Sequence, residues 1–108
     1  MADELLDQIK KEIDSNPIVL FTKGTTEVPM CGFSARTIAV FKELGKPFKT
    51  VDILPDPRLR QVLSSYSNWP TIPQVFIKGK FIGGCDIVTE MYQNGELQPL
   101  VEKAFERP

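Results

Sequence analysis

Apolar positions along the chain follow two spacings, one typical of helices and one typical of strands. The first helical pattern has Asp3 as a candidate N-cap and ends at Asn16-Pro17. Its apolar face is made by Leu5, Leu6, Ile9 and Ile13. The run 18–21 that follows is apolar without interruption, which predicts a strand over 18–22 that is buried on both faces.

The middle of the chain predicts a strand–helix–strand unit. A helix is expected over 32–44, where Gly45 and Pro47 stop it, and a second strand over 48–53. The short connections favour parallel strands with a right-handed crossover. Asp56 and Pro57 then mark the N-cap and the first position of a third helix. The apolar stripe of that helix consists of Leu59, Val62, Leu63 and Tyr66.

The last third of the chain predicts a β-hairpin and two helices. Strands are expected over 74–77 and 80–83, on either side of the turn pair Lys78-Gly79. Asp86 is expected to cap a helix that continues through Tyr92, and an amphipathic helix follows over 97–105. The order α β α β α β β α α fits one α/β domain over 1–108. Its expected architecture is the thioredoxin-like fold, a four-stranded mixed sheet flanked by about five helices.

Composition narrows the class of protein. The 108 residues are 42% hydrophobic and 25% charged, as in ordinary globular domains. A net charge of −1 gives no global attraction to nucleic acid or to anionic membranes, and neither is expected as a partner. No run approaches the roughly 20 apolar residues that span a bilayer. The acidic N-terminus has no signal-peptide pattern, so we expect a cytoplasmic protein, with an organelle-processed form left open.

The chain has two cysteines and no histidine. Without histidine, a Ser–His or Cys–His catalytic pair cannot be built, and a four-ligand zinc site is disfavoured. Cys31 and Cys85 are too far apart for a Cys-x-x-Cys motif, and in a reducing compartment they are expected as free thiols.

Cys31 is the candidate reactive centre. A lone cysteine is most often a small buried apolar residue. Here, however, Pro29 precedes the cysteine, Gly32 follows it, and the predicted helix starts at once. The positive end of that helix and the nearby Lys23 should both lower the thiol pKa. Ser34 stands where a dithiol enzyme has its resolving cysteine. Chemistry at Cys31 therefore needs an external thiol, the other cysteine, or metal binding instead of exchange.

Three other features could form a binding site with Cys31. The Ile72–Pro73 bond is a candidate cis peptide, which would turn the Ile72 backbone outward to pair with an extended peptide. The turn 83–86 is an ordinary strand-to-helix connection whose open helix N-terminus could also bind a carboxylate. Cys85, within that turn, is either a second functional thiol or a packed spectator. Arg60 lies beside the apolar stripe of its helix, where it could bind a carboxylate.

The motif Cys31-Gly32-Phe33-Ser34 resembles the signature of the monothiol glutaredoxins of the CGFS type, in their single-domain form. The likeness extends over nearly the whole chain through the loop 23–30, the block 69–74 and the turn 83–86. It implies a 2Fe–2S cluster shared across a homodimer, with Cys31 of each subunit as the protein's metal ligand. Two bound glutathione molecules supply the other two thiolates. Without the cluster a monomer is expected.

The same resemblance implies the roles of the glutathione-binding residues. Lys23 and Arg60 would bind the glycine-end carboxylate, Ile72 would pair with the cysteinyl backbone, and Cys85 with Asp86 would hold the γ-glutamyl end. The remaining candidates are Gly32, Phe33, Thr71, Pro73 and Gly84. The family passes clusters to acceptor proteins, and some members pair with BolA-like proteins. Whether the chain is an enzyme stays open, because two alternatives remain: a glutathione-dependent oxidoreductase that deglutathionylates proteins, and a redox sensor that uses Cys31 and Cys85.

Overall fold

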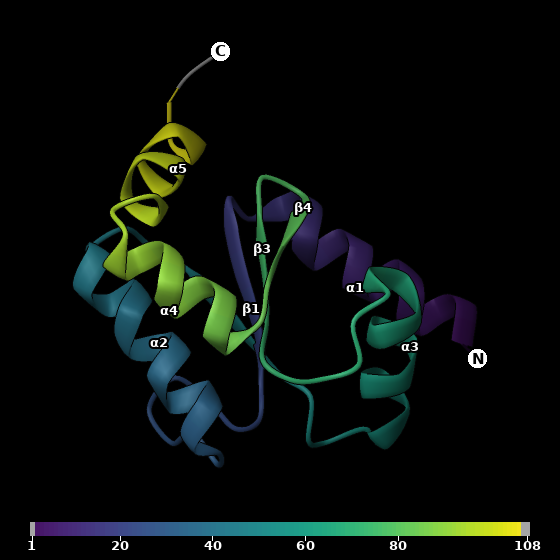
Figure 1. Cartoon of the computed structure of the whole chain (residues 1–108). Coiled ribbons are helices and arrows are strands. Elements are labelled where there is room, and N and C mark those ends of the chain that lie inside the picture. The colour runs from purple at the N-terminus through teal and green to yellow at the C-terminus, as the bar shows by residue number, and fades with distance from the viewer. Residues whose placement is uncertain (1, 107–108) are drawn as a thin grey trace.

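The computed structural model describes residues 2–106 and shows helices on both faces of a central sheet (Figure 1). Four strands form this sheet in the order β2-β1-β3-β4. β1 runs parallel to β2 and antiparallel to β3, and β3 and β4 form an antiparallel hairpin. The elements in chain order are α1 (Ala2–Ser15), β1 (Ile18–Thr22), α2 (Gly32–Leu44), β2 (Lys49–Asp52), α3 (Pro57–Ser67), β3 (Gln74–Ile77), β4 (Lys80–Gly83), α4 (Cys85–Gln93) and α5 (Leu97–Ala104).

The predicted thioredoxin-like architecture is confirmed: a four-stranded mixed sheet with five helices within the described residues. α2 and α4 lie on one side of the sheet and α1 and α3 on the other (Figure 1). All five positions of β1 are buried, as its uninterrupted apolar run predicts. None of the helices in this part of the chain is long and apolar enough to cross a membrane.

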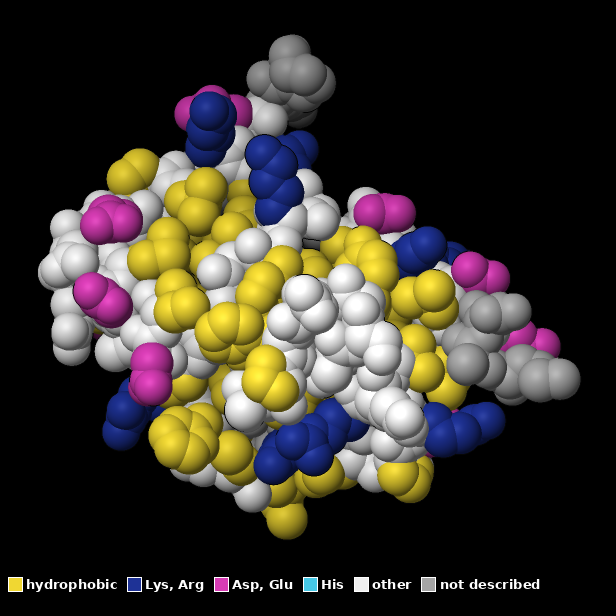
Figure 2. All heavy atoms as spheres, turned by 45° about the vertical axis from the view of Figure 1, so that its right-hand side comes forward, with side chains coloured by type: hydrophobic (Ala, Val, Ile, Leu, Met, Phe, Trp, Pro, Cys, Tyr) yellow, Lys and Arg dark blue, Asp and Glu magenta, His cyan; other side chains and the backbone are white. Residues whose placement is uncertain are grey.

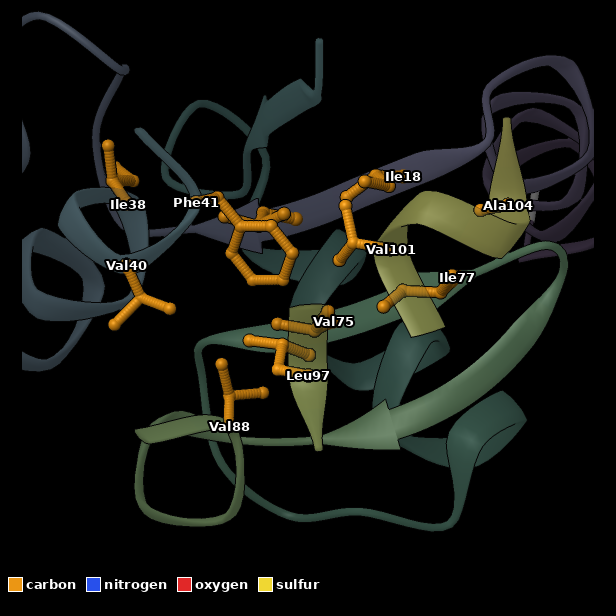
Figure 3. Packing of buried hydrophobic residues seen from close by; sticks show 11 residues of the cluster. Ile18, Ile38, Val40, Phe41, Val75, Ile77, Val88, Leu97, Val101 and Ala104 are labelled. Atoms are coloured by element: carbon orange, nitrogen blue, oxygen red, sulfur yellow. The ribbon is translucent and has the colours of Figure 1, made fainter. Parts of the chain in front are cut away.

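Alternate residues of β1 enter two separate cores, because successive side chains of a strand point to opposite faces. On the face of α2, α4 and α5, the ring of Phe41 and the side chains of Val75 and Leu97 point toward one another (Figure 3). The buried members of this cluster are Ile18, Leu20, Ile38, Val40, Phe41, Val75, Ile77, Val88, Leu97, Val101 and Ala104.

The second core lies between the sheet and helices α1 and α3. Here Phe21 packs edge-on against Phe76, with ring centroids 5.6 Å apart. Its buried members are Ile9, Ile13, Val19, Phe21, Ile53, Leu63, Ile72 and Phe76. With both faces covered, β1 is a rigid central strand whose C-terminal end leads directly into Lys23 and the candidate site.

Several element ends differ from the sequence prediction; the smallest difference is at α5, which ends at Ala104 and not at residue 105. α1 begins at Ala2, so Asp3 lies inside its first turn and is not its N-cap. The second strand covers only Lys49–Asp52, because Phe48 packs against the first core instead of joining the sheet. The N-cap of α4 is Gly84, and Asp86 lies in the first turn of that helix.

The start of α3 agrees with its predicted capping. Asp56 is the N-cap, Pro57 is the first helical residue, and the Asp56 carboxylate accepts a hydrogen bond from the Arg58 backbone N–H at 3.0 Å. The same carboxylate forms a salt bridge with the Arg58 guanidinium at 2.8 Å. α3 therefore starts at a defined residue, which sets the position of Arg60 one turn further on.

Candidate functional site

Cys31 is the N-cap of α2, with extended backbone angles φ −155° and ψ 140°. Its carbonyl accepts the first helical hydrogen bond, from the Ala35 N–H at 2.9 Å. The thiol is partly exposed and free. An ideal Cβ added at Gly32 would meet nothing within 4 Å, so the space beside the thiol is open. The predicted place of Cys31, at the mouth of a strand–loop–helix turn, is confirmed.

The pKa of the Cys31 thiol lies below its ordinary value. Burial acts to raise this pKa, but hydrogen bonds from the Ser34 and Phe33 backbone N–H groups and from the Ser34 hydroxyl lower it. The positive charge of Lys23 lowers it further. These donors are the open first turn of α2, the part of a helix that favours an anion. Cys31 therefore carries more thiolate at neutral pH than an ordinary cysteine.

Ser34 joins the first turn of α2 to the end of β1. Its side chain is fully buried, and its Oγ accepts a hydrogen bond from the Lys23 backbone N–H at 3.0 Å. Since the hydroxyl can accept and donate at once, Ser34 accepts from Lys23 while it donates to the Cys31 sulfur. The residue at the resolving position thus supports the thiolate and cannot attack a disulfide.

The loop between β1 and Cys31 is held by hydrogen bonds that its backbone N–H groups donate, one to a backbone carbonyl and one to a side-chain carboxylate. The Met30 N–H donates to the Lys23 carbonyl at 2.8 Å, and the Gly24 N–H donates to the Asp52 carboxylate at 2.9 Å. Gly24 has φ +91°, and a Cβ at this position would collide with the Val28 carbonyl and lie 2.6 Å from the Met30 nitrogen. Only glycine fits there, which fixes the path of the chain into Cys31.

Three large apolar side chains flank Cys31 and are exposed to solvent. The exposed fractions are 61% for Val28, 65% for Met30 and 58% for Phe33. On one face of the molecule, hydrophobic side chains lie next to Lys and Arg side chains along the lower edge (Figure 2). Exposed apolar residues that surround a reactive group are typical of a contact surface.

A cleft of about 580 Å³ lies beside Cys31 and is built from segments far apart in the sequence. Nine of the ten residues predicted to bind glutathione line it, and only Gly32 does not. Cys31 itself is not among the lining residues, but its near neighbours Lys23 and Phe33 are. The full lining is Lys23, Phe33, Arg60, Trp69, Thr71, Ile72, Pro73, Gly84, Cys85, Asp86 and Ile87.

Charges in the cleft are of both signs. Lys23 and Arg60 contribute cations, and the Arg60 guanidinium donates a hydrogen bond to the Pro70 carbonyl at 3.3 Å. The N-cap of α4 is Gly84, which makes no side-chain cap hydrogen bond, and Asp86 is exposed in the first turn of this helix. The cleft thus offers two cations, a carboxylate and helix N–H donors to one ligand.

The predicted cis peptide bond between Ile72 and Pro73 is confirmed. The Ile72 side chain is only 6% exposed and packs in the second core.

Cys85 is a second free thiol, but it is only 6% exposed. Its sulfur lies 3.9 Å from the Thr89 hydroxyl. Among residues 2–106, no group of three or more His, Cys, Asp or Glu side chains comes together to hold a metal ion.

Two residues of the cleft, Trp69 and Ile87, were not among the predicted binding residues. The signal for Trp69 is an aromatic residue in a proline-rich turn; its ring packs on Phe81 with centroids 5.5 Å apart. The signal for Ile87 is an apolar residue directly after Asp86, in the helix that follows the turn; a Cβ at Gly83 would lie 2.9 Å from the Ile87 side chain. Both signals become specific only when the fold is known.

A partly exposed thiolate at a helix N-terminus, beside a cleft of a thioredoxin-like sheet, defines a thiol protein of the thioredoxin class. The family model that matches the chain is that of glutaredoxin, over residues 18–82. The chain belongs to the glutaredoxin family. Its relatives include a protein named as a monothiol glutaredoxin, which shares 50% sequence identity with it.

Two curated relatives illustrate the match. Glutaredoxin 4 of Haemophilus influenzae is 52% identical over 98 residues, which cover 91% of this chain and 92% of that protein. The chloroplastic monothiol glutaredoxin-S14 of Arabidopsis thaliana is 50% identical over 105 residues. That alignment covers 97% of this chain but only 61% of the Arabidopsis protein.

Solved structures agree with the fold. The reduced apo form of poplar GrxS14 superposes with a TM-score of 0.83 at 50% identity, and covers 93% of this chain and 92% of that one. The buckwheat glutaredoxin–glutathione complex superposes with a TM-score of 0.85 at 30% identity, and covers 95% of this chain and 92% of that one.

Proposed function

We propose that this protein is an iron–sulfur carrier that binds glutathione in the cleft and shares a 2Fe–2S cluster between two copies of the chain. The cluster is its cargo, which it passes to acceptor proteins. The observation that carries the proposal is the pairing of one stabilised thiolate, Cys31, with a buried Ser34 where a dithiol enzyme has its second cysteine.

The chemistry of the cleft supports glutathione as its ligand. Glutathione has two carboxylates and one amine, and the cleft provides Lys23, Arg60, Asp86 and the open N-terminus of α4. The cleft volume of about 580 Å³ is in the range of small-molecule sites. The buckwheat relative was solved as a glutathione complex. The proposed binding residues are Lys23, Gly32, Phe33, Arg60, Thr71, Ile72, Pro73, Gly84, Cys85 and Asp86.

Each chain, together with one bound glutathione, can supply two of the four thiolates of a shared cluster. A 2Fe–2S cluster takes four thiolates. Cys31 is partly exposed and can supply one, whereas Cys85 is buried. Two chains and two glutathione thiolates complete the set. The exposed apolar residues Val28, Met30 and Phe33 would be covered when two copies meet. We therefore expect a monomer without cluster and a homodimer with it, or a mixed complex in which a BolA-like protein replaces one copy.

Anaerobic reconstitution with iron, sulfide and glutathione tests this function. We expect a coloured protein of dimer size that loses its absorption when glutathione is removed. Cys31→Ser should abolish the colour. Cys85→Ser removes the other thiol and asks whether Cys85 is a cluster ligand; a variant that still binds the cluster shows that it is not. A colourless monomer under conditions that load a known carrier would overturn the proposal.

A second function is supported by the lowered pKa of Cys31, which suits thiol–disulfide exchange. The Cys31 thiolate would attack the glutathione sulfur of a protein–glutathione disulfide, which releases the protein thiolate and leaves Cys31 in a mixed disulfide with glutathione. The thiolate of a free glutathione would then attack the glutathione sulfur of that mixed disulfide, which forms oxidised glutathione and releases the Cys31 thiolate. A rapid steady-state rate with a glutathionylated peptide, without cluster binding, would favour this oxidoreductase over the carrier.

A redox sensor remains the third proposal, since both cysteines are free thiols. It requires a Cys31–Cys85 disulfide, which mass spectrometry after mild oxidation would detect. All three functions need a reducing compartment; we propose the cytoplasm, while the relatives include both a bacterial and a chloroplastic protein.

A further inference from the structure

We propose that Gln74 is a positioning residue of the cleft: its side-chain amide holds the loop 69–73 in the shape that presents Thr71 and Ile72 to the ligand. The inference rests on the proposed glutathione site and adds a residue that does not line the cleft. Gln74 is the first residue of β3, where it lies opposite Phe21 of the central strand.

The contacts of Gln74 are those of a double hydrogen-bond donor. Its side chain is fully buried, with an exposed fraction of 0%. The Nε2 group donates one bond to the Trp69 carbonyl at 3.0 Å and one to the Thr71 carbonyl at 3.2 Å. The Oε1 atom is buried without a partner, so the contacts of this amide in the loop are all made by its nitrogen.

The loop needs donors from side chains because of its composition. Pro70 and Pro73 have no N–H group, which limits the hydrogen bonds that the loop can make with itself. Carbonyl groups that are partly shielded from water, as those of Trp69 and Thr71 are, still need hydrogen-bond partners. Gln74 satisfies those of Trp69 and Thr71, and Arg60 satisfies that of Pro70 between them. Three consecutive carbonyls are thus held by side chains anchored on β3 and α3.

This arrangement transmits the rigidity of the sheet to the cleft. One planar amide fixes the carbonyls of Trp69 and Thr71, so the peptide groups on both sides of Pro70 have little freedom. Trp69, Thr71 and Ile72 all line the cleft. If Gln74 served only to stabilise the fold, its replacement would lower stability but leave ligand affinity of the folded protein unchanged.

Two substitutions separate positioning from stability. Gln74→Glu is nearly isosteric but turns carboxylate oxygens toward two carbonyls, and Gln74→Met keeps the length of the side chain without a donor. Each folded variant should bind glutathione about tenfold more weakly, since about two neutral hydrogen bonds that order the loop are lost. In Gln74→Met the pKa of Cys31 should stay as in the wild type, because burial, Ser34, Phe33 and Lys23 set this pKa and Gln74 does not.

The experiment titrates the full chain with glutathione by calorimetry and follows the pH dependence of Cys31 alkylation in the same samples. Gln98→Glu, an exposed position on α5, makes the same charge change away from the cleft and should bind like the wild type. A folded Gln74→Met protein with wild-type affinity overturns the positioning role. If Gln74→Glu does not fold, the glutathione affinity of Gln74→Met alone tests the positioning role.

A third measurement keeps this inference separate from the proposed function. If the wild-type chain binds no glutathione at millimolar concentration, the proposed function fails. In that case the hydrogen bonds from Gln74 to the loop are tested without ligand, by measuring with NMR how fast the protons of the Gln74 side-chain amide exchange with water. Slow exchange supports the two hydrogen bonds to Trp69 and Thr71, and exchange as fast as that of Gln98 overturns them.

Discussion

At the residue scale, the reactivity of Cys31 depends on a serine that is itself unreactive. The Ser34 hydroxyl and backbone N–H both lower the pKa of the Cys31 thiol, and the hydroxyl also anchors the Lys23 backbone. Lys23 in turn adds a positive charge near the sulfur. A cysteine at position 34 would supply a resolving thiol but a weaker hydrogen-bond donor. The sequence Cys-Gly-Phe-Ser thus favours a stable thiolate over a rapid internal disulfide.

Ser34→Ala should raise the pKa of Cys31, because the thiolate loses the hydroxyl donor. The partly buried Lys23 N–H also loses its acceptor, which should cost about 1–2 kcal/mol of unfolding free energy. The pH dependence of alkylation by iodoacetamide measures the first effect and chemical denaturation the second. Ser65→Ala, exposed on α3, is the matched control and should change neither. An unchanged alkylation midpoint would contradict the assigned role of the Ser34 hydroxyl.

The same pKa gives stability a defined pH dependence. The folded thiol has a lower pKa than the unfolded one, so deprotonation of Cys31 favours the folded state. Its contribution is fully present above the unfolded pKa and is lost as the pH falls through the folded pKa. In Ser34→Ala the pKa of Cys31 in the folded state should lie closer to its pKa in the unfolded state, so the free energy of unfolding should depend less on pH.

At the scale of elements, the sequence pattern predicted every helix and strand in the described part of the chain, because helices bury one regularly spaced face, β1 is an uninterrupted apolar run, and a turn pair marks the hairpin. The N-terminal end of α4 was less predictable, because a glycine takes the N-cap position although an aspartate, a residue type that caps helices more often, lies two residues further on. Asp86 suits an N-cap by residue type, yet Gly84 takes that position. A Cβ at Gly84 would lie 3.1 Å from the Trp69 indole nitrogen, so packing across the cleft selects the glycine. Sequence spacing does not contain that contact.

The candidate site was predictable as a set of motifs, and the family resemblance joined them. The chain brings together residues of the loop after β1, helix α3, the loop 69–73 and the start of α4. Their joint lining of one cleft requires the sheet order β2-β1-β3-β4, which no local pattern encodes. For the same reason Trp69 and Ile87 were missed.

The loop 23–30 provides a test at the element scale. Gly24→Ala should distort the loop, because the added Cβ would collide with the Val28 carbonyl and the Met30 nitrogen, which are backbone atoms. We expect a loss of at least about 3 kcal/mol in unfolding free energy from strain and overpacking together. Chemical denaturation measures this loss.

Gly95→Ala is the matched control for the loop variant. Gly95 has a similar positive φ of +77°, but a Cβ there would meet nothing within 4 Å. It should lose only the left-handed backbone preference, about 1–2 kcal/mol. Equal losses for the two variants would mean that the close approach in the loop has no energetic consequence.

At the scale of the whole molecule, the two cores leave one end of the sheet for function. Helices cover both faces of β1, so stability comes from the layers, while the chain that leaves β1 carries Lys23, the closed loop and Cys31. Exposed apolar groups gather in sequence around that cysteine. A monomer gains nothing from their exposure, whereas contact with a second copy would remove apolar area from water.

This surface makes a prediction about assembly. Met30→Glu places a charge beside Cys31 at a position that is 65% exposed and does not line the cleft, so the monomer should fold and bind glutathione as before. In the proposed dimer the carboxylate would be buried without a partner, which should weaken cluster-dependent dimerisation about tenfold or more. Analytical ultracentrifugation of reconstituted protein, detected by cluster absorption, measures the dimer fraction. Tyr92→Glu, near the far end of α4 and 37% exposed, is the control and should dimerise normally. If both variants dimerise like the wild type, the apolar residues around Cys31 are not the contact between copies.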